Sequence, residues 1–153
     1  MKISEIMTRA VIRATPGTTI REAAEKMRSY GIGTLPILEG RRRLGIVTDR
    51  DIVIRLLADH GPVAKMPVIE AMSPKPACCF PDQDVAEAAA LMGDLQIMRL
   101  LVVDRNDDLV GILSVGDIAE NASEELAGQA LGEISEKRRS ALPPIASRVS
   151  AQR

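Results

Sequence analysis

Aromatic side chains are almost absent from this chain of 153 residues, which contains one tyrosine (Tyr30), one phenylalanine (Phe80) and no tryptophan. Single-stranded nucleic acids bind to platforms of several exposed rings, so the sequence excludes that class of binding protein. The core must consist of Ile, Leu, Val, Met and Ala. Any base that the protein recognises must therefore lie between aliphatic side chains and backbone groups.

Residue types that carry enzyme chemistry are also scarce. The one histidine, His60, precedes Gly61 at the predicted end of a helix, where we interpret it as a terminator and not as a catalytic base. The two cysteines, Cys78 and Cys79, are adjacent, which suits neither a relaxed disulfide nor a metal site. The sequence has no glycine-rich phosphate loop and no cluster of metal ligands. We predict that the protein is not an enzyme and has neither a catalytic nor a metal site.

Long apolar runs and a strong net charge are lacking as well. The longest apolar stretches are strand-sized, so no segment is expected to span a bilayer. The first residues, MKISEIMTRAV, place charges where a signal peptide has its apolar core. The net charge of −1 gives no general attraction to nucleic acid or to an anionic membrane. We therefore expect a cytoplasmic protein that contacts neither.

What the chain does contain is an internal repeat. Residues 2–8 (KISEIMT) match residues 67–73 (PVIEAMS) at an offset of 65, and the same offset pairs Met27 with Met92. One inserted residue near 105–109 changes the offset to 66, so that GIVT before Asp49 aligns with GILS before Val115. Neither copy has enough apolar surface for a core of its own, so we expect the two copies to pack together.

Each copy has the pattern of a β-α-β-β-α unit. Alternating apolar residues predict the strands, and a 3.6-residue apolar period with capping residues predicts the helices. In the first copy we expect strands at Val11–Ala14, Leu35–Leu38 and Leu44–Val47, a helix from the box Thr19-x-x-Glu22 to Gly31, and a second helix from Thr48 to about Asp59. In the second copy the corresponding elements are strands at Ala77–Phe80, Leu100–Val103 and Leu109–Leu113, with helices from the box Asp84-x-x-Glu87 and from Ser114.

The predicted domain boundaries follow from the repeat. Repeat one spans residues 2–61, a linker spans 62–66, and repeat two with a C-terminal helix spans 67–133. Residues 134–153 are basic, and we expect a disordered tail there, with contact to an acidic partner as an alternative. The run Arg41-Arg42-Arg43 falls in a hairpin turn, where we expect solvated side chains or, alternatively, a partner contact.

The repeat resembles a known family. The segments GIGTLPIL and GIVTDRDI in copy one, with IMRLLVVD and GILSVGDI in copy two, resemble the CBS domain, and residues 2–125 resemble a stand-alone CBS-domain pair. The resemblance implies an α+β fold in which the two repeats pack sheet to sheet as a pseudo-twofold pair, the Bateman module. It further implies a homodimer and one cleft per repeat, which in the family often binds AMP, ADP, ATP, NAD or S-adenosylmethionine.

The family's ribose-binding signature, Ser/Thr-x-x-Asp, is present as Thr48-x-x-Asp51 and Ser114-x-x-Asp117. A helix N-terminus with free backbone N–H groups favours a phosphate, and the carboxylate one turn later can accept hydrogen bonds from ribose hydroxyls. The same residues also form a helix capping arrangement, whose role can be purely structural. The residues alone leave both interpretations open.

The resemblance assigns further residues to the two clefts. Arg50 lies inside the first signature, where it serves a phosphate or is simply solvated, and Arg99 lies in MRLLVVD, which resembles a family segment whose arginine contacts phosphate. Copy two has Leu101 where copy one has Pro36, so we expect unequal clefts and favour copy one. The full set of predicted ligand-binding residues is Ile12, Gly33, Thr34, Leu35, Pro36, Ile46, Thr48, Arg50 and Asp51 in copy one, with Met98, Arg99, Leu100, Ile112, Ser114 and Asp117 in copy two.

The function that the resemblance implies is regulatory. We expect a module that senses an adenosine nucleotide and signals to an effector protein, whose identity the sequence does not give, by conformational change. No cofactor is required beyond that ligand. The alternative is a CBS-pair scaffold or dimerisation protein that has no physiological small ligand.

Overall fold

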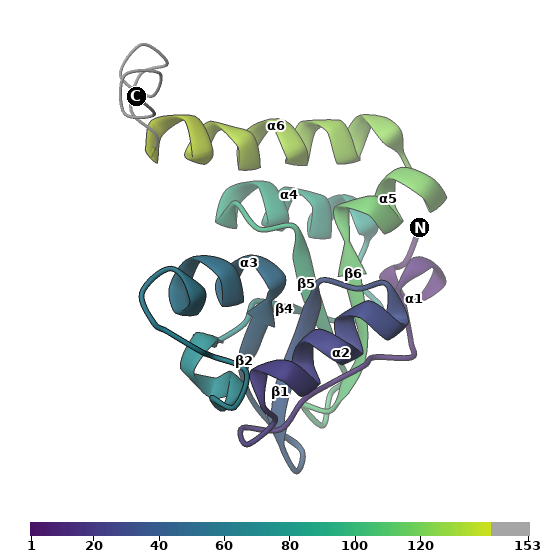
Figure 1. Ribbon diagram of the computed structural model, residues 1–153. Helices are drawn as coiled ribbons and strands as arrows, with labels where there is room; N and C mark the ends of the chain where they lie inside the picture. The colour runs from purple at the N-terminus through teal and green to yellow at the C-terminus, as the bar shows by residue number, and fades with distance from the viewer. Residues whose placement is uncertain (142–153) are drawn as a thin grey trace. The chain divides into compact units, whose positions relative to one another are not determined.

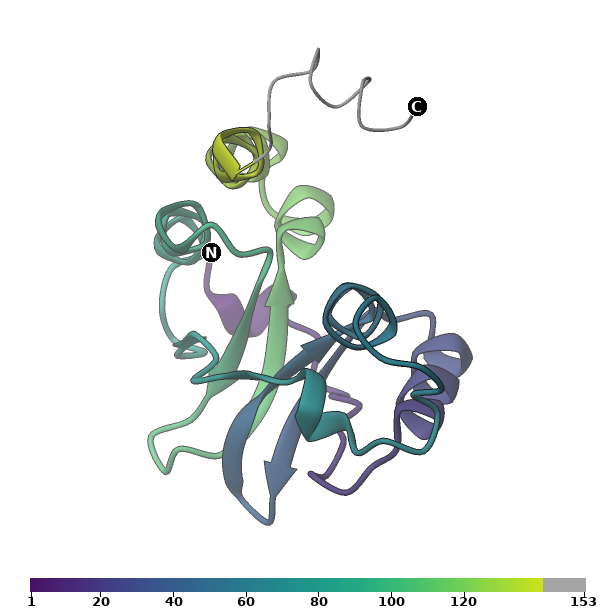
Figure 2. The same cartoon turned by 60° about the vertical axis from the view of Figure 1, so that its left-hand side comes forward.

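The computed structural model describes the backbone of residues 1–141 and the side chains of residues 1–136. It contains helices and two three-stranded sheets, which confirms the predicted α+β fold (Figures 1 and 2). The chain divides into two compact units. The first unit consists of Ala10–Ala77 and Asp107–Leu109, and the second of Met1–Arg9, Cys78–Asn106 and the described chain from Val110 onward.

The first unit is built on the sheet β1-β2-β3. Strands β1 and β2 are antiparallel, with Thr34 opposite Thr48 and Pro36 opposite Ile46, and β3 pairs antiparallel with β2. The elements of this unit, in chain order, are α2 (Ile20–Tyr30), β1 (Thr34–Glu39), β2 (Arg42–Thr48), α3 (Asp49–Asp51), η1 (Ile52–Leu57), η2 (Val68–Ala71) and β3 (Ser73–Pro74).

One face of this sheet forms the core of the first unit. Leu35, Ile37 and Val47 have no solvent exposure and cluster with the apolar face of α2 and with Leu56 of η1. The predicted capping box is confirmed, because Thr19 Oγ1 accepts from the Glu22 amide at 3.2 Å and the Glu22 carboxylate accepts from the Thr19 amide at 2.7 Å. Gly31 ends α2 in the left-handed conformation, as predicted.

The second unit is built on the sheet β4-β5-β6, in which β4 pairs parallel with β5. Helix α6 packs along α4 and α5, burying Ala127, Ala130 and Ile134 (Figure 1). The elements of this unit are α1 (Ile3–Ile6), β4 (Cys78–Cys79), α4 (Val85–Leu95), β5 (Arg99–Val103), β6 (Leu109–Ser114), α5 (Val115–Asn121) and α6 (Glu124–Ala141).

Several predicted elements differ from the structure. The strand expected at Val11–Ala14 is reduced to one bridge from Ala14 to Ile37, and the strand at Ala77–Phe80 shortens to the two residues of β4. Asp84 caps α4 through the Ala86 amide at 2.8 Å, instead of through a reciprocal box with Glu87. Helix α6 continues through residue 134, the predicted start of the basic tail, and ends at Ala141. The rest of that tail, residues 142–153, lies outside the described residues.

The segments that begin the two repeats are exchanged between the units. Thr8, from the start of repeat one, pairs with Ile112 in the second unit, with backbone N···O distances of 2.9 and 3.0 Å. Ser73, from the start of repeat two, pairs with Ile46 in the first unit. Each of these segments, which we call lead-in segments (residues 2–8 and 67–73), therefore completes the sheet of the other repeat.

Two glycines at equivalent places make room for the lead-in segments. A Cβ atom added to Gly45 would overlap the carbonyl oxygen of Ser73 and lie 2.6 Å from the sulfur of Met72. A Cβ atom added to Gly111 would lie 2.6 Å from the sulfur of Met7 and 3.2 Å from the carbonyl oxygen of Thr8. The glycine that precedes each Ser/Thr-x-x-Asp signature is thus required by the backbone that crosses it.

The run of three arginines is not simply solvated. Arg41 contacts the carboxylate of Asp108 through two guanidinium nitrogens, of which Nε lies 2.6 Å from Oδ1. Arg43 donates to the carboxylate and to the backbone carbonyl of Asp107, at 2.8 and 2.6 Å. Both aspartates belong to the turn near 105–109 in which the inserted residue occurs, so this turn supplies the partners of the basic hairpin.

We predict that Gly45→Ala destabilises the protein by about 1–3 kcal/mol, because the new methyl group displaces the backbone at Ser73. The matched control is Gly17→Ala, since nothing lies within 4 Å of a Cβ atom at Gly17. The midpoint of urea unfolding, measured by circular dichroism, tests both variants. Equal midpoints for the two would contradict the close approach at Gly45.

The Arg41 guanidinium beside Asp108 lowers the pKa of that carboxyl below its usual range through a direct hydrogen bond. A carboxyl whose pKa is lowered by folding adds stability above its unfolded pKa of about 3.9, and this stability is lost as the pH falls through the folded value. We therefore expect Asp108→Asn to lower the melting temperature at pH 7, with the difference from the unaltered protein shrinking below about pH 4.

Because the Arg41 side chain is largely exposed, added salt should weaken this effect. Asp59→Asn is the control, since Asp59 forms no ion pair with any described residue. A melting difference that does not change with pH would show that Asp108 acts through something other than its charge.

Candidate functional site

The first Ser/Thr-x-x-Asp signature lies where β2 ends and α3 begins. Thr48 has an extended backbone, and its Oγ1 accepts a hydrogen bond from the Asp51 amide at 3.1 Å. Asp51 Oδ2 in turn accepts from the Thr48 amide at 2.9 Å, and Oδ1 lies 3.6 Å from Nε of Arg55. The carboxylate is 17% exposed. One of its oxygens therefore caps the helix, and the other faces a cation one turn later.

The second signature repeats the cap with a different environment. Asp117 Oδ2 accepts from both the amide and the hydroxyl of Ser114, each at 2.7 Å, and the Asp117 amide donates to Ser114 Oγ at 3.1 Å. The residue equivalent to Arg55 is Asn121, whose side-chain amide donates to the Asp117 carbonyl at 3.1 Å. Asp117 Oδ1 has no hydrogen-bond partner among the residues that the structure describes.

The strand register places the copy-one residues on two faces of the sheet. Thr34, Pro36, Ile46 and Thr48 lie on one face, because directly opposed residues of an antiparallel pair share a face. Leu35 points to the other face and is fully buried in the core, so only its backbone is available to a ligand. The structure thus brings four of the predicted residues together as a patch, which we call the Thr48 face.

Three further predicted copy-one residues, Gly33, Arg50 and Ile12, lie outside this face and differ in their contacts and exposure. Gly33 lies at the start of β1, where its carbonyl accepts from the Asp49 amide at 3.0 Å. Arg50 is exposed and forms no ion pair with a described residue. Ile12 is half-buried and packs against the core cluster of the first unit.

The predicted copy-two residues occupy equivalent positions in the second unit, but their side chains differ from those of copy one. The Met98 carbonyl accepts from the Val115 amide at 3.0 Å, as Gly33 does in copy one, and the Met98 side chain is 38% exposed. Arg99 is exposed at the start of β5, whereas Leu100 is fully buried. The backbone of Ile112 is paired with Thr8 of the lead-in segment.

Thr34 carries the one described buried side-chain oxygen or nitrogen that lacks a hydrogen-bond partner. Thr34 is 6% exposed, and its Oγ1 meets no described donor or acceptor. It lies directly opposite Thr48 on the Thr48 face. A buried hydroxyl without a partner costs about 1–3 kcal/mol, so a hydrogen-bond partner for this atom would stabilise the protein.

Three residues that contact the signatures in the structure, Asp49, Arg55 and Asn121, were not singled out from the sequence. Arg55 stands four residues after Asp51, a spacing that places the two on one helix face and that the sequence already contained. Asn121 stands four residues after Asp117 in the same way. Asp49 gave no such signal, because the contact of its carboxylate with the Arg50 amide depends on the direction of the side chain.

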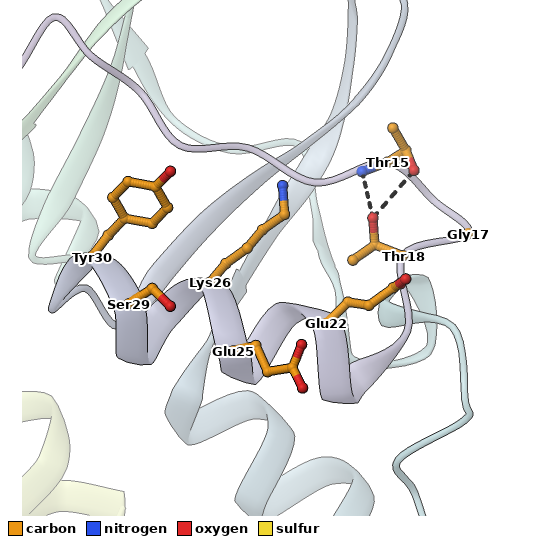
Figure 3. A pocket seen from close by; sticks show the side chains of 8 residues that line it. All are labelled: Thr15, Gly17, Thr18, Glu22, Glu25, Lys26, Ser29 and Tyr30. Atoms are coloured by element: carbon orange, nitrogen blue, oxygen red, sulfur yellow. Dashed lines mark hydrogen bonds between the residues drawn. The ribbon is translucent and has the colours of Figure 1, made fainter.

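A hollow of about 630 Å³ lies elsewhere on the first unit, along the outer side of α2 (Figure 3). Its polar groups are largely used within the protein: Thr18 Oγ1 accepts from the Thr15 amide at 3.1 Å, and Lys26 donates to the Arg13 carbonyl at 2.9 Å. It contains none of the predicted ligand-binding residues, so it is distinct from the Thr48 face. Its lining residues are Thr15, Gly17, Thr18, Glu22, Glu25, Lys26, Ser29 and Tyr30.

Other chemistry is not assembled in the described part of the chain. No three His, Cys, Asp or Glu side chains are grouped there to hold a metal ion, and no helix there is long and apolar enough to cross a membrane. Burial, with a contribution from the neighbouring Cys78, raises the pKa of the Cys79 thiol to about 12. Cys79 is therefore a protonated, unreactive core side chain at neutral pH.

Both repeats carry a hydroxyl and a carboxylate at the junction between the last strand and the helix that follows it. The sequence profile of the CBS domain matches residues 3–58 and again residues 68–124. The chain belongs to the CBS domain family.

Similarity to known proteins extends over most of the chain. The CBS domain-containing protein YhcV of Bacillus subtilis is 40% identical over 134 residues, which are 87% of this chain and 94% of that protein. The structure of a CBS domain protein from Pyrobaculum aerophilum complexed with AMP has a TM-score of 0.73 at 28% identity, covering 84% of this chain and 99% of that one. An inosine-5'-monophosphate dehydrogenase of Korarchaeum cryptofilum is 30% identical, but the matched stretch is 25% of that enzyme.

We predict that Thr48→Ala lowers the free energy of unfolding by about 0.5–2 kcal/mol, because the helix loses its N-cap. Thr48→Ser keeps the hydroxyl, as copy two does at Ser114, and should retain most of the stability. Urea unfolding of both variants measures the difference. If Ala and Ser at position 48 were equally stable, the hydroxyl would not be needed as a cap.

Proposed function

We propose that the protein is a regulatory module that senses an adenosine-containing nucleotide and signals to an effector protein by conformational change, without turnover. In this proposal it acts as a cytoplasmic homodimer and needs no cofactor other than the ligand. The observation that carries the proposal is the buried, unpartnered hydroxyl of Thr34 on the Thr48 face.

The position of Thr34 connects that hydroxyl to the signature. Directly opposed residues of an antiparallel pair have Cβ atoms about 4.5–5.5 Å apart, so Thr34 and Thr48 present neighbouring hydroxyls. A nucleotide on this face would give Thr34 Oγ1 its missing partner and would lie against Pro36 and Ile46. These aliphatic walls suit a base in a chain that has almost no aromatic rings.

The remaining groups would serve the rest of the nucleotide. Asp51 and Asp117 would accept from ribose hydroxyls, since a carboxylate oxygen that already accepts one hydrogen bond retains a second lone pair. Arg50 and Arg99, both exposed, would contribute positive charge toward a phosphate. The AMP complex of the relative from Pyrobaculum aerophilum supports an adenosine nucleotide as the ligand class.

One observation favours a second function, a scaffold without a small ligand. Both signatures already form complete capping boxes within the chain, so their residues have a structural role that needs no nucleotide. In that case the module would act through protein contacts alone. The two functions differ in whether adenosine compounds stabilise the folded protein.

We predict that Thr34→Val raises the melting temperature without ligand while weakening the ligand response. The isosteric methyl group removes a buried hydroxyl that has no partner, and it also removes the group that a nucleotide would contact. The measurement is thermal unfolding with AMP, ADP, ATP, NAD or S-adenosylmethionine. A ligand at a hundred times its Kd should stabilise the unaltered protein by about 2.7 kcal/mol.

Thr34→Ser, which keeps a hydroxyl, is the matched control and should preserve the ligand response. Asp51→Ala and Asp117→Ala assign the response to one cleft or the other. If no adenosine compound stabilises the unaltered protein, the scaffold function replaces the sensing function. If a compound does so but Thr34→Val responds equally, the site is not on the Thr48 face.

A further inference from the structure

Three large apolar side chains are exposed on η1, the helix that follows the first signature. Val53, Ile54 and Leu57 are each between 51% and 56% exposed. Val53 and Leu57 are one turn apart and Ile54 is next to Val53, so the three side chains lie on one side of η1. Leu56 is 2% exposed and belongs to the core of the first unit. We call the three exposed side chains the η1 face.

The second repeat has no such apolar set at the equivalent positions. At the offset of 66, the η1 face corresponds to Ala119, Glu120 and Ser123, of which one is small and two are polar. The fold that both repeats share therefore does not require large apolar side chains here. A group of apolar side chains that the fold does not need, and that solvent contacts, indicates a surface that another molecule covers.

In the second unit a helix of the chain itself covers the corresponding elements. Helix α6 lies over α4 and α5, which are the counterparts of α2 and of α3 with η1 (Figures 1 and 2). Ala89 and Gly93 of α4 are buried, whereas their counterparts in the first unit, Ala24 and Arg28, are exposed. Among the described residues, no helix of the first unit takes the place of α6, so its helix pair is uncovered.

Arg28 limits how the first unit can be covered. In the second unit, a Cβ atom added to Gly93 would overlap the carboxylate of Glu133 on α6, so α6 can lie on α4 only because this residue is a glycine. A helix placed on α2 in the same way would meet the long side chain of Arg28. A molecule that covers the first unit must therefore contact η1 more than α2.

A second copy of the chain suits the η1 face. A twofold contact brings the same three side chains from both copies together, so that each face is covered by its equal. The charges beside the face are balanced, because Arg55 faces Asp51 at 3.6 Å, and the net charge of −1 gives two copies little reason to repel each other. Three side chains provide less than the roughly 800 Å² that each partner buries in a standard interface, so the contact is small and reversible.

We propose that two copies associate through their η1 faces alone, because α6 closes the corresponding face of the second unit. The assembly stops at two copies, since each copy has one open face and a twofold contact uses both. This inference rests on the homodimer of the proposed function and names its interface. The contact needs no nucleotide.

Analytical ultracentrifugation of the full chain without ligand, over a series of protein concentrations, tests the proposal. The unaltered protein should show a reversible equilibrium between monomer and dimer. Leu57→Glu places a charge in the contact and should raise the Kd of the dimer by roughly tenfold or more. Because Leu57 is 56% exposed, the monomer should keep its fold, which circular dichroism of a dilute sample checks.

Leu131→Glu is the matched control. Leu131 is a leucine of similar exposure, 44%, but it lies on α6 in the second unit. The same change of side chain at this position should leave the Kd of the dimer within about twofold.

The other outcomes separate the interface from the proposed function. If Leu57→Glu leaves the dimer intact, or if Leu131→Glu dissociates it as well, the η1 face is not the sole contact and the inference is wrong, while the homodimer stands. Assemblies larger than a dimer would reveal a second open face and would also overturn the inference. If the unaltered protein is a monomer at every concentration, the inference and the homodimer both fail. Nucleotide sensing is decided independently, by the thermal unfolding series with adenosine compounds.

Discussion

The pair of hydrogen bonds between a strand-ending hydroxyl residue and an aspartate three positions later is the constraint on which both candidate clefts depend. At Thr48 and Asp51, and again at Ser114 and Asp117, these bonds fix the residue at which the strand stops and the helix starts. The neighbouring strand joins the same point through the carbonyl of Gly33 or Met98. Every other candidate contact is placed relative to that junction, so a ligand at either site would meet residues that already cap a helix.

The two junctions have the same backbone hydrogen bonds, but different side chains surround them. The first unit surrounds its junction with polar and charged groups: a buried hydroxyl at Thr34, a carboxylate at Asp49 and a guanidinium at Arg55. The second unit has Arg99, Val115 and Asn121 at the equivalent positions. Duplication thus preserved the hydrogen bonds that hold the fold, while the residues between them diverged. The two candidate sites therefore differ in chemistry although their backbone is the same.

Much of the fold could be predicted because its determinants are local. The box at Thr19 and Glu22, the left-handed exit at Gly31 and the alternation in β1 and β2 each depend on a few consecutive residues. Strand β3 could not be predicted, because it has two residues and exists only by pairing with β2. The Arg41–Asp108 contact likewise joins residues 67 positions apart. The start of the tail was misplaced because basic residues suit a helix end as well as a disordered segment.

The candidate site was likewise predictable from the sequence only in part. The signatures and their neighbours on β1 and β2 could be identified from the resemblance, and the register then determined which of them share a face. Composition could not reveal that the Thr34 hydroxyl lacks a partner, since this depends on every group around it. The direction of the Asp49 side chain is similarly a matter of one rotamer and one glycine. Which side chains lack a partner, and which fill a neighbouring space, therefore requires coordinates.

The exchange of lead-in segments also bears on whether one repeat could fold alone. Because residues 2–8 pair with the sheet of one repeat and residues 67–73 with the sheet of the other, neither repeat contains all the backbone that its own sheet uses. A cut between the repeats would therefore leave each half with an unpaired strand edge, which is a surface prone to pair with another chain.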